Sequence, residues 1–208
     1  QLNIVVITAI ASTLTKGSVA VFNLANNLSA IMVNAIAVSL STAVFPAMSL
    51  AYSKEDSADF ERKFGGALKQ ILFLVIPASI LIFILRAQIV RVVLGTGKFG
   101  WLDTRLTAAC LGIFALGLLA QGLIFILSKT FYAAHNAKIP AIISFATVVF
   151  NIIISLIFVR LISHNGIFHN IIESSMRLYG IDDIRVVGLA LAFSITAIAE
   201  TLLLFLFV

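Results

Sequence analysis

Four polar side chains recur at helical spacing within the long apolar stretch from Ser18 to Tyr52. They are Asn23, Asn27, Asn34 and Ser41, which lie four, seven and seven residues apart, and Asn26 borders them. At 3.6 residues per turn, these positions fall within one narrow strip of a helix. Amides and hydroxyls donate and accept hydrogen bonds without carrying charge. The chemistry that this strip offers is therefore the binding of polar groups.

Two interpretations of this strip remain open from the residues alone. Asn and Ser side chains in membrane helices often hydrogen-bond a neighbouring helix, so the strip is consistent with helix-to-helix contacts. Polar groups are costly in lipid and tend to face a cavity, so the strip is equally consistent with a cavity lining.

A second set of polar residues lies deep in other apolar segments. Glu200 is the only acid within an apolar segment, and it lies about 21 Å beyond Val186 at 1.5 Å per residue. The same count places Asn34 and Gln121 about 24 and 25 Å into their own segments, whereas Asn151 is shallower. We therefore expect a shared polar pocket. Glu200 is interpreted either as a coupling switch or as a structural partner of Gln121, and Gln121 and Asn151 as pocket residues or interhelical hydrogen-bonders.

The sequence offers no constellation typical of covalent catalysis or metal binding. It has no glycine-rich phosphate loop, no Ser-His-Asp set and no paired carboxylates in its apolar segments. The single cysteine, Cys110, lies in an apolar segment, and the three histidines lie in loops. Basic runs interleaved with aromatic residues are also missing, which disfavours nucleic-acid binding. We expect no enzyme activity, no cofactor and no metal.

Composition identifies the elements that must hold these residues. The chain is 61% hydrophobic and 11% charged, whereas soluble domains are about a quarter charged. A bilayer core of about 30 Å requires about 20 apolar helical residues. We expect an all-α, polytopic membrane helix bundle with about six transmembrane helices. The segments are 1–14, 18–52 with a kink at Pro46, 66–85, about 104–128, 140–162, and from about 186 onward.

Three stretches are expected to lie outside the membrane core. Residues 86–101 mix apolar residues with Gln, Arg and Lys, which predicts a short interfacial segment with Trp101 as an anchor. Residues 164–183 are predicted to form a polar extramembrane loop, and 54–63 a solvated charged stretch. The net charge of +5 favours anionic lipid as the surface near the basic loops. Because the sequence begins at Gln1 within an apolar segment, we expect a piece of a longer chain.

Several short stretches, in order and at matching spacing over nearly the whole chain, resemble the MurJ/MviN family of lipid II flippases, within the multidrug/oligosaccharidyl-lipid/polysaccharide exporter superfamily. They are Gln1-Leu2-Asn3, Gly17-Ser18-Val19, Ala25-Asn26-Asn27-Leu28, Pro46-Ala47-Met48-Ser49, Gly97-Lys98-Phe99, Phe131-Tyr132-Ala133 followed by Pro140, and Gly188-Leu189-Ala190-Leu191-Ala192. The resemblance implies that residues 1–208 correspond to helices seven to twelve of about fourteen. They would form part of the C-terminal lobe of a two-lobed transporter whose N-terminal lobe is absent from this sequence.

The resemblance further implies a multi-pass protein of the bacterial inner membrane that translocates lipid II for peptidoglycan synthesis by alternating access. Its partners would be the lipid-linked precursor, membrane lipids and the missing lobe. Asn23, Asn27 and Asn34 would then line the cavity and bind the headgroup. The alternatives are a flippase for another polyprenyl-linked oligosaccharide and a membrane scaffold that has lost transport.

Two departures from the family pattern affect these expectations. Asn27 stands where the family usually has an arginine that suits a pyrophosphate, and Ile7 where some members carry an acid that suits a cation. The resemblance also places the loops at 54–63 and 129–138 in the cytoplasm. The opposite loops carry eight Lys and Arg against six, which favours the reverse orientation. Because that difference is only two, we expect the orientation that the resemblance implies.

Overall fold

A computed structural model describes residues 2–95, 99–163, 167–176, 178, 180–181 and 183–207. The described chain is helical, and no β-strand occurs in these ranges. The helices are α1 (Leu2–Ser12), α2 (Ser18–Val33), the π-helical turn η1 (Asn34–Val38), α3 (Ser39–Ser53), α4 (Ser57–Leu94), α5 (Trp101–Ala133), α6 (Lys138–Ser163), α7 (Ile167–Met176) and α8 (Arg185–Phe207).

Five helical spans in the described chain are long and apolar enough to cross a bilayer. They are Ser18–Ser53, formed by α2, η1 and α3 together, and the helices α4, α5, α6 and α8. The expected all-α polytopic bundle is confirmed. The sixth expected segment, residues 1–14, contains α1, which is 11 residues long. A helix of that length is shorter than the bilayer core.

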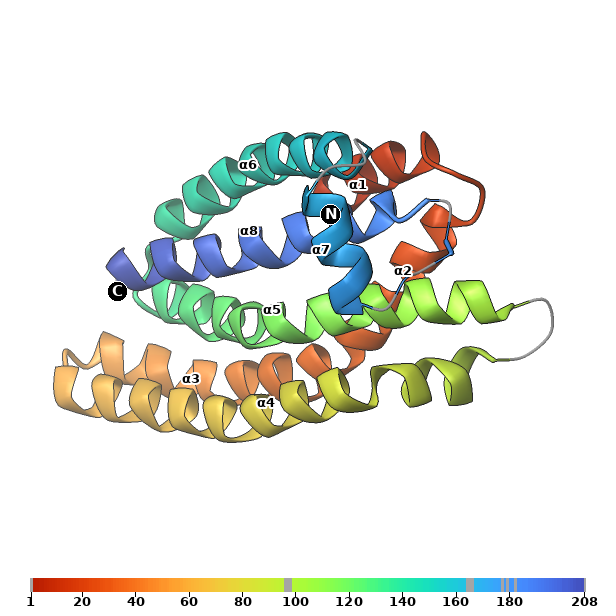
Figure 1. Ribbon diagram of the computed structural model, residues 1–208. Helices are drawn as coiled ribbons and strands as arrows, with labels where there is room; N and C mark the ends of the chain where they lie inside the picture. The colour runs from red at the N-terminus through yellow and green to blue at the C-terminus, as the bar shows by residue number, and fades with distance from the viewer. Residues whose placement is uncertain are drawn as a thin grey trace.

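The bundle is built around α5 (Figure 1). α5 packs against α2, α4 and α8, and α8 in turn lies against α6. α3 and α4 form a long antiparallel pair along one side. α5 is the most buried of the five spans, and many of its residues are Gly or Ala. Small side chains let neighbouring backbones approach closely, which is how helices in lipid gain van der Waals contact.

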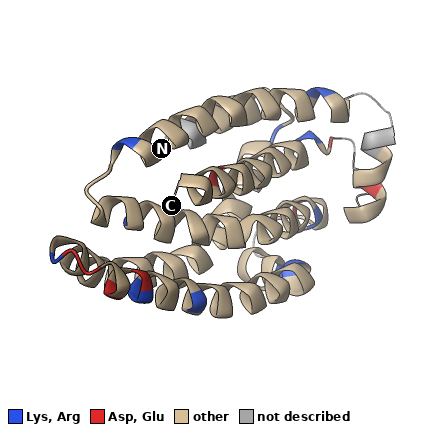
Figure 2. Ribbon diagram, turned by 90° about the vertical axis from the view of Figure 1, so that its left-hand side faces the viewer, with Lys and Arg blue, Asp and Glu red and all other residues tan. Residues whose placement is uncertain are grey.

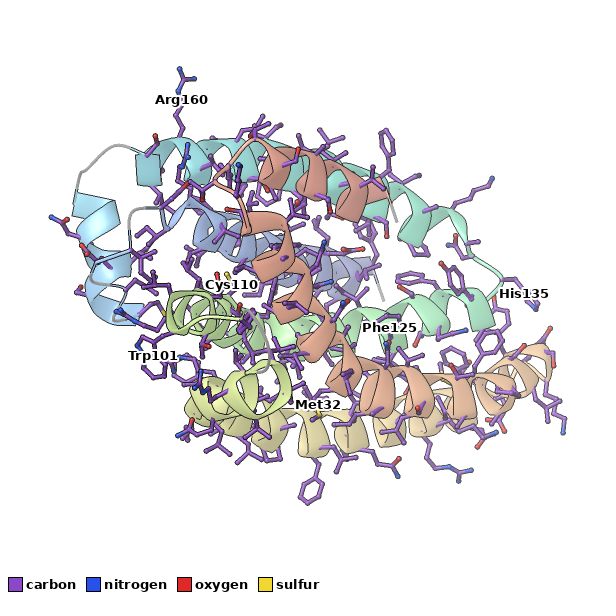
Figure 3. All side chains as sticks on the ribbon, turned by 90° about the vertical axis from the view of Figure 1, so that its right-hand side faces the viewer. Met32, Trp101, Cys110, Phe125, His135 and Arg160 are labelled. Atoms are coloured by element: carbon purple, nitrogen blue, oxygen red, sulfur yellow. The ribbon has the colours of Figure 1, made fainter. Side chains whose placement is uncertain are left out.

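Charged residues gather towards the ends of the helices (Figure 2). Trp101 and His135, near the two ends of α5, lie at opposite ends of the bundle, and Arg160 points away from it (Figure 3). Because charges are costly in lipid, this distribution suits a bundle whose helix middles lie in the bilayer.

Local sequence explains where several helices begin. Gly17, in the turn between α1 and α2, has φ +99°, a left-handed conformation that glycine adopts without strain. Asp56 caps α4 by accepting a hydrogen bond at 2.9 Å from the backbone N–H of Asp59. Asp103 accepts one at 3.0 Å from the N–H of Gly100 at the start of α5. A negatively charged side chain in the first turn also interacts favourably with the positive end of the helix dipole.

Residues 86–94 are not a separate segment, contrary to the sequence prediction. They are the last turns of α4, which runs unbroken over 38 residues. Such a helix is about 57 Å long at 1.5 Å per residue, much longer than a bilayer core of about 30 Å. The charged residues near its two ends, such as Arg62 and Arg91, therefore lie outside the apolar middle. An interfacial position for 86–101 stays a prediction.

The stretch 164–183 is also not wholly a loop, because it contains α7. In α7, Ile172 is buried and Ile171 is exposed. The polar residues that suggested a loop lie among isoleucines. A short helix forms there, and its backbone N–H and C=O groups hydrogen-bond within the helix. His164 and His169 lie outside the residues whose side chains the structure describes.

An ion pair marks the start of α8. The guanidinium of Arg185 donates two hydrogen bonds to the carboxylate of Asp183, at 2.8 and 2.7 Å. Partial burial raises the pKa of Asp183, but the bonds from Arg185 and the Thr15 hydroxyl outweigh it and hold that pKa below its ordinary value. Because Thr15 lies between α1 and α2, the carboxylate ties this turn to α8.

Asp183→Asn is expected to destabilise the protein by about 1 kcal/mol at neutral pH. Because the folded-state pKa is depressed, the contribution is complete above the ordinary value of about 3.9 and is lost as pH falls through the folded-state pKa. Thermal unfolding of wild type and variant against pH measures this. Arg185→Gln should cost a similar amount, and the double variant no more than either. Additive losses would show that the pair is not coupled.

Candidate functional site

The asparagines predicted to form a strip lie on the side of α2 that faces away from the core. Asn27 and Asn34 are exposed, and Asn23 and Asn26 are half-buried. The opposite side of α2 packs against α5, where the rings of Phe22 and Phe114 meet with centroids 5.5 Å apart. The four amides, three on α2 and Asn34 at the start of η1, therefore share an exposed face, called here the amide face of α2.

Ser41 does not share the amide face, contrary to the helical count. It is fully buried, and its hydroxyl has no hydrogen-bond partner among the described residues. The physical reason is η1, in which hydrogen bonds join residues five apart, so that each residue turns the chain less than in an α-helix. Residues beyond Val38 consequently face a different direction from the one that a 3.6-residue period assigns them.

The change of direction in this span also falls at η1, between α2 and α3. Figure 3 shows α2 crossing the bundle obliquely, with Met32 near its end, before α3 turns to run beside α4. Pro46, the predicted kink, lies inside α3. The hydroxyl of Ser39 donates to the carbonyl of Asn34 at 3.1 Å and so stabilises the π turn.

Glu200 of α8 faces α6. Its carboxylate accepts a hydrogen bond from the hydroxyl of Ser144 at 2.8 Å, and both side chains are half-buried. The next residue, Thr201, faces α5 and donates to the carbonyl of Ala120 at 2.9 Å. Consecutive residues on a helix are about 100° apart, so α8 contacts two helices at this level.

Asn151 is a buried hydrogen-bonding residue between α6 and α8. Its amide donates to the hydroxyl of Thr196 at 3.0 Å, and its carbonyl accepts from Ser155 at 3.4 Å. All three residues are buried. Ser144 and Asn151 are seven residues apart and lie on one face of α6. Glu200 and Asn151 thus belong to one polar interface between α6 and α8.

Gln121 contributes differently from the prediction of a three-residue pocket. It lies on α5, and its side-chain nitrogen is buried without a hydrogen-bond partner in the described chain. A Cβ on the adjacent Gly122 would lie 3.3 Å from the Cβ of Ala37, so this level of α5 matches the level of η1. The level of Gln121 thus agrees with the depth count, but no hydrogen bond joins Gln121 to Glu200 in the described chain, and the shared polar pocket stays a prediction.

Sequence reasoning missed the hydroxyl partners. Ser144, Thr196 and Thr201 each form an interhelical hydrogen bond, as does Ser194, which donates to the carbonyl of Ile113 at 3.0 Å. The spacing of Ser144, Asn151 and Ser155 places them on one face of α6 and could have indicated a polar contact with a neighbouring helix.

The geometry suits binding and helix contact more than bond-making chemistry. Within the described ranges, no three His, Cys, Asp or Glu residues gather as metal ligands do. The site instead comprises the exposed amide face of α2 and the polar α6–α8 interface. Neutral amides bind sugars and other polar groups by hydrogen bonds.

Comparison with known proteins identifies what this arrangement is similar to. A family model described as lipid II flippase MurJ matches residues 1–169. A probable lipid II flippase MurJ of Buchnera aphidicola is 28% identical over 167 residues, which cover 80% of this chain and 33% of that protein. The lipid II flippase MurJ of Burkholderia cenocepacia is 28% identical, with 80% and 32% covered. The probable lipid II flippase MurJ of Rickettsia prowazekii is 30% identical, with 80% and 33% covered.

The fold has a solved counterpart. A structure of lipid II flippase MurJ in an inward closed conformation aligns with a TM-score of 0.79 and 29% identity, over 99% of this chain and 39% of that one. The present chain therefore spans about a third of the length of the curated relatives that it matches.

Proposed function

Because the chain belongs to the lipid II flippase MurJ family, we propose that it forms part of a transporter that moves a lipid-linked peptidoglycan precursor across a bacterial cytoplasmic membrane. The observation that supports this best is the correspondence of 99% of the chain to a lipid II flippase fold. Transport proceeds by alternating access, and no covalent bond forms or breaks, so the protein is not an enzyme.

In this proposal, the amide face of α2 lines the path of the headgroup. Asn23, Asn26, Asn27 and Asn34 lie on a membrane-spanning helix yet face away from the core. Amides that face lipid are costly because lipid offers them no hydrogen bonds. Water in a transport path hydrogen-bonds them, and the sugar and peptide groups of a lipid-linked precursor offer matching donors and acceptors.

One observation favours a second candidate. The amide face carries no charge, and the family resemblance implies an arginine where this chain has Asn27, so the amide face supplies no cation there for a pyrophosphate. That neutrality suits a flippase for another polyprenyl-linked oligosaccharide, or a scaffold that no longer transports.

Complementation tests the proposed function. The full-length protein that contains this chain should restore growth to a bacterium depleted of its own lipid II flippase. Absence of rescue, with the protein present in the membrane at the native flippase's level, would contradict the proposal. Transport of a different polyprenyl-linked oligosaccharide would then identify the second candidate.

We also propose that Glu200 takes part in coupling. Glu200→Gln is expected to lower the transport rate by about tenfold or more, because the variant loses the acidic group in the membrane span that could exchange a proton or pair with a cation. The amide oxygen of Gln still accepts the bond from Ser144, so the fold is expected to persist. Ser144→Ala is the matched control, since it removes the bond and keeps the carboxylate. Unchanged transport in Glu200→Gln would leave Glu200 with a structural role alone.

A further inference from the structure

A groove of about 340 Å³ lies between α3 and α4, the two helices of the long antiparallel pair. Its lining comprises Leu40, Ala43 and Val44 from α3, and Arg62, Lys63, Gly66, Ala67 and Gln70 from α4. The α3 residues recur at three- and four-residue spacing, as do those of α4, so the groove is formed by two facing helix edges.

The groove has a cationic end and a long apolar wall. The ammonium of Lys63 donates to the carbonyl of Ala47 at 3.1 Å, which places Ala47 and Lys63 at one level. Because the helices are antiparallel, Leu40 lies towards the Gln70 end. The nine residues from Arg62 to Gln70 span about 12 Å, eight steps of about 1.5 Å each. This length fits part of an acyl chain beneath a headgroup.

The charged side chains that line the groove are both basic. Arg62 and Lys63 both pair with the single carboxylate of Asp59. No Asp or Glu lines the groove itself. The other acids of the charged turn between α3 and α4, Glu55, Asp56 and Glu61, do not line the groove either, so the charged side chains that line it are the two cations Arg62 and Lys63.

Gly66 keeps the groove open. Glycine weakens a helix interior, so its presence in α4 needs a reason. A Cβ built on Gly66 meets no heavy atom within 4 Å, so close packing is not that reason. The neighbouring Gly65 is equally unobstructed but does not line the groove.

We propose that this groove binds an anionic phospholipid of the surrounding bilayer. The phosphate lies against Arg62 and Lys63, and an acyl chain lies along Leu40 and Val44. Basic pockets between membrane helices recognise anionic headgroups in this way. Both helices belong to membrane-spanning segments, so the bilayer supplies the ligand directly. The site does not depend on which cargo the protein transports.

Lipid binding to the detergent-purified full-length protein tests the site. Bound phosphatidylglycerol and phosphatidylcholine are counted by native mass spectrometry during titration with each lipid. We expect wild type to prefer phosphatidylglycerol, and Arg62→Gln to lower that affinity about fivefold while leaving phosphatidylcholine unchanged. Gly66→Leu fills the groove and should lower phosphatidylglycerol affinity about tenfold or more.

Gly65→Leu is the matched control and should bind phosphatidylglycerol as wild type does. The proposal is overturned if Gly66→Leu retains wild-type affinity, if Gly65→Leu loses as much, or if wild type binds both lipids equally. Arg62 is largely exposed, with 80% of its side chain accessible, so its variant keeps the test decisive if the leucine variant fails to fold.

Discussion

Gly117→Leu is expected to destabilise the bundle by about 3 kcal/mol, the upper end of the range that is usual for overpacking, because the contact involves backbone. A Cβ at Gly117 would lie 2.9 Å from the Cβ of Ser194 and 3.1 Å from its Cα. The obstruction includes α8 backbone, which cannot move aside as a flexible side chain can. Thermal unfolding of the full-length protein in detergent, followed by size-exclusion chromatography, measures the loss.

The matched control for this variant is Gly65→Leu. Both substitutions place leucine in a helix interior, but a Cβ at Gly65 meets nothing within 4 Å. We therefore expect Gly65→Leu to keep or slightly exceed the wild-type unfolding temperature, because leucine also favours the helix more than glycine does. Equal unfolding temperatures for the two variants would show that α5 and α8 do not approach closely at Gly117.

The contact at Gly117 also shows which interactions hold helices together in lipid. Apolar burial gains little when lipid is as apolar as the core, so helices associate through close packing and interhelical hydrogen bonds. The α5–α8 contact combines both, because Ser194 packs on Gly117 and donates to the carbonyl of Ile113. The α6–α8 contact adds the bond from Asn151 to Thr196.

Apolar length alone predicted the outer helices well. The segment expected from 140 to 162 is α6, Lys138–Ser163, and the one expected from about 186 is α8, which begins at Arg185. These boundaries lie where a run of apolar residues, which suits lipid, gives way to polar and charged residues, which suit water. The same contrast failed at the end of α4, because residues 86–94 mix both types and yet continue the helix.

The position of Ser41 was not predictable from the sequence. No residue type in Asn34–Val38 indicates a π turn. A count of 3.6 residues per turn therefore placed Ser41 on the wrong face. The contacts around η1 are tertiary, as with Ala37 against Gly122 of α5. The four asparagines lie before or at the start of η1, so their shared face was predicted correctly even though Ser41 was not.

We propose that the amide face of α2 lines a water-filled transport path. Exposure alone does not distinguish water from lipid, because Phe73 of α4 is 78% exposed on a membrane-spanning helix. Thiol chemistry does distinguish them. The reactive thiolate forms in water and is suppressed in lipid, where burying a charge is costly.

The most direct measurement is therefore labelling of single-cysteine variants by a membrane-impermeant thiol reagent, in full-length protein carrying Cys110→Ala and no other cysteine. We expect Asn27→Cys to react at least about tenfold faster than Phe73→Cys, which lipid covers. Ser29→Cys, buried on the same helix, should also be protected. Protection of Asn27→Cys in every transport state, or equal labelling of Phe73→Cys, would contradict the claim.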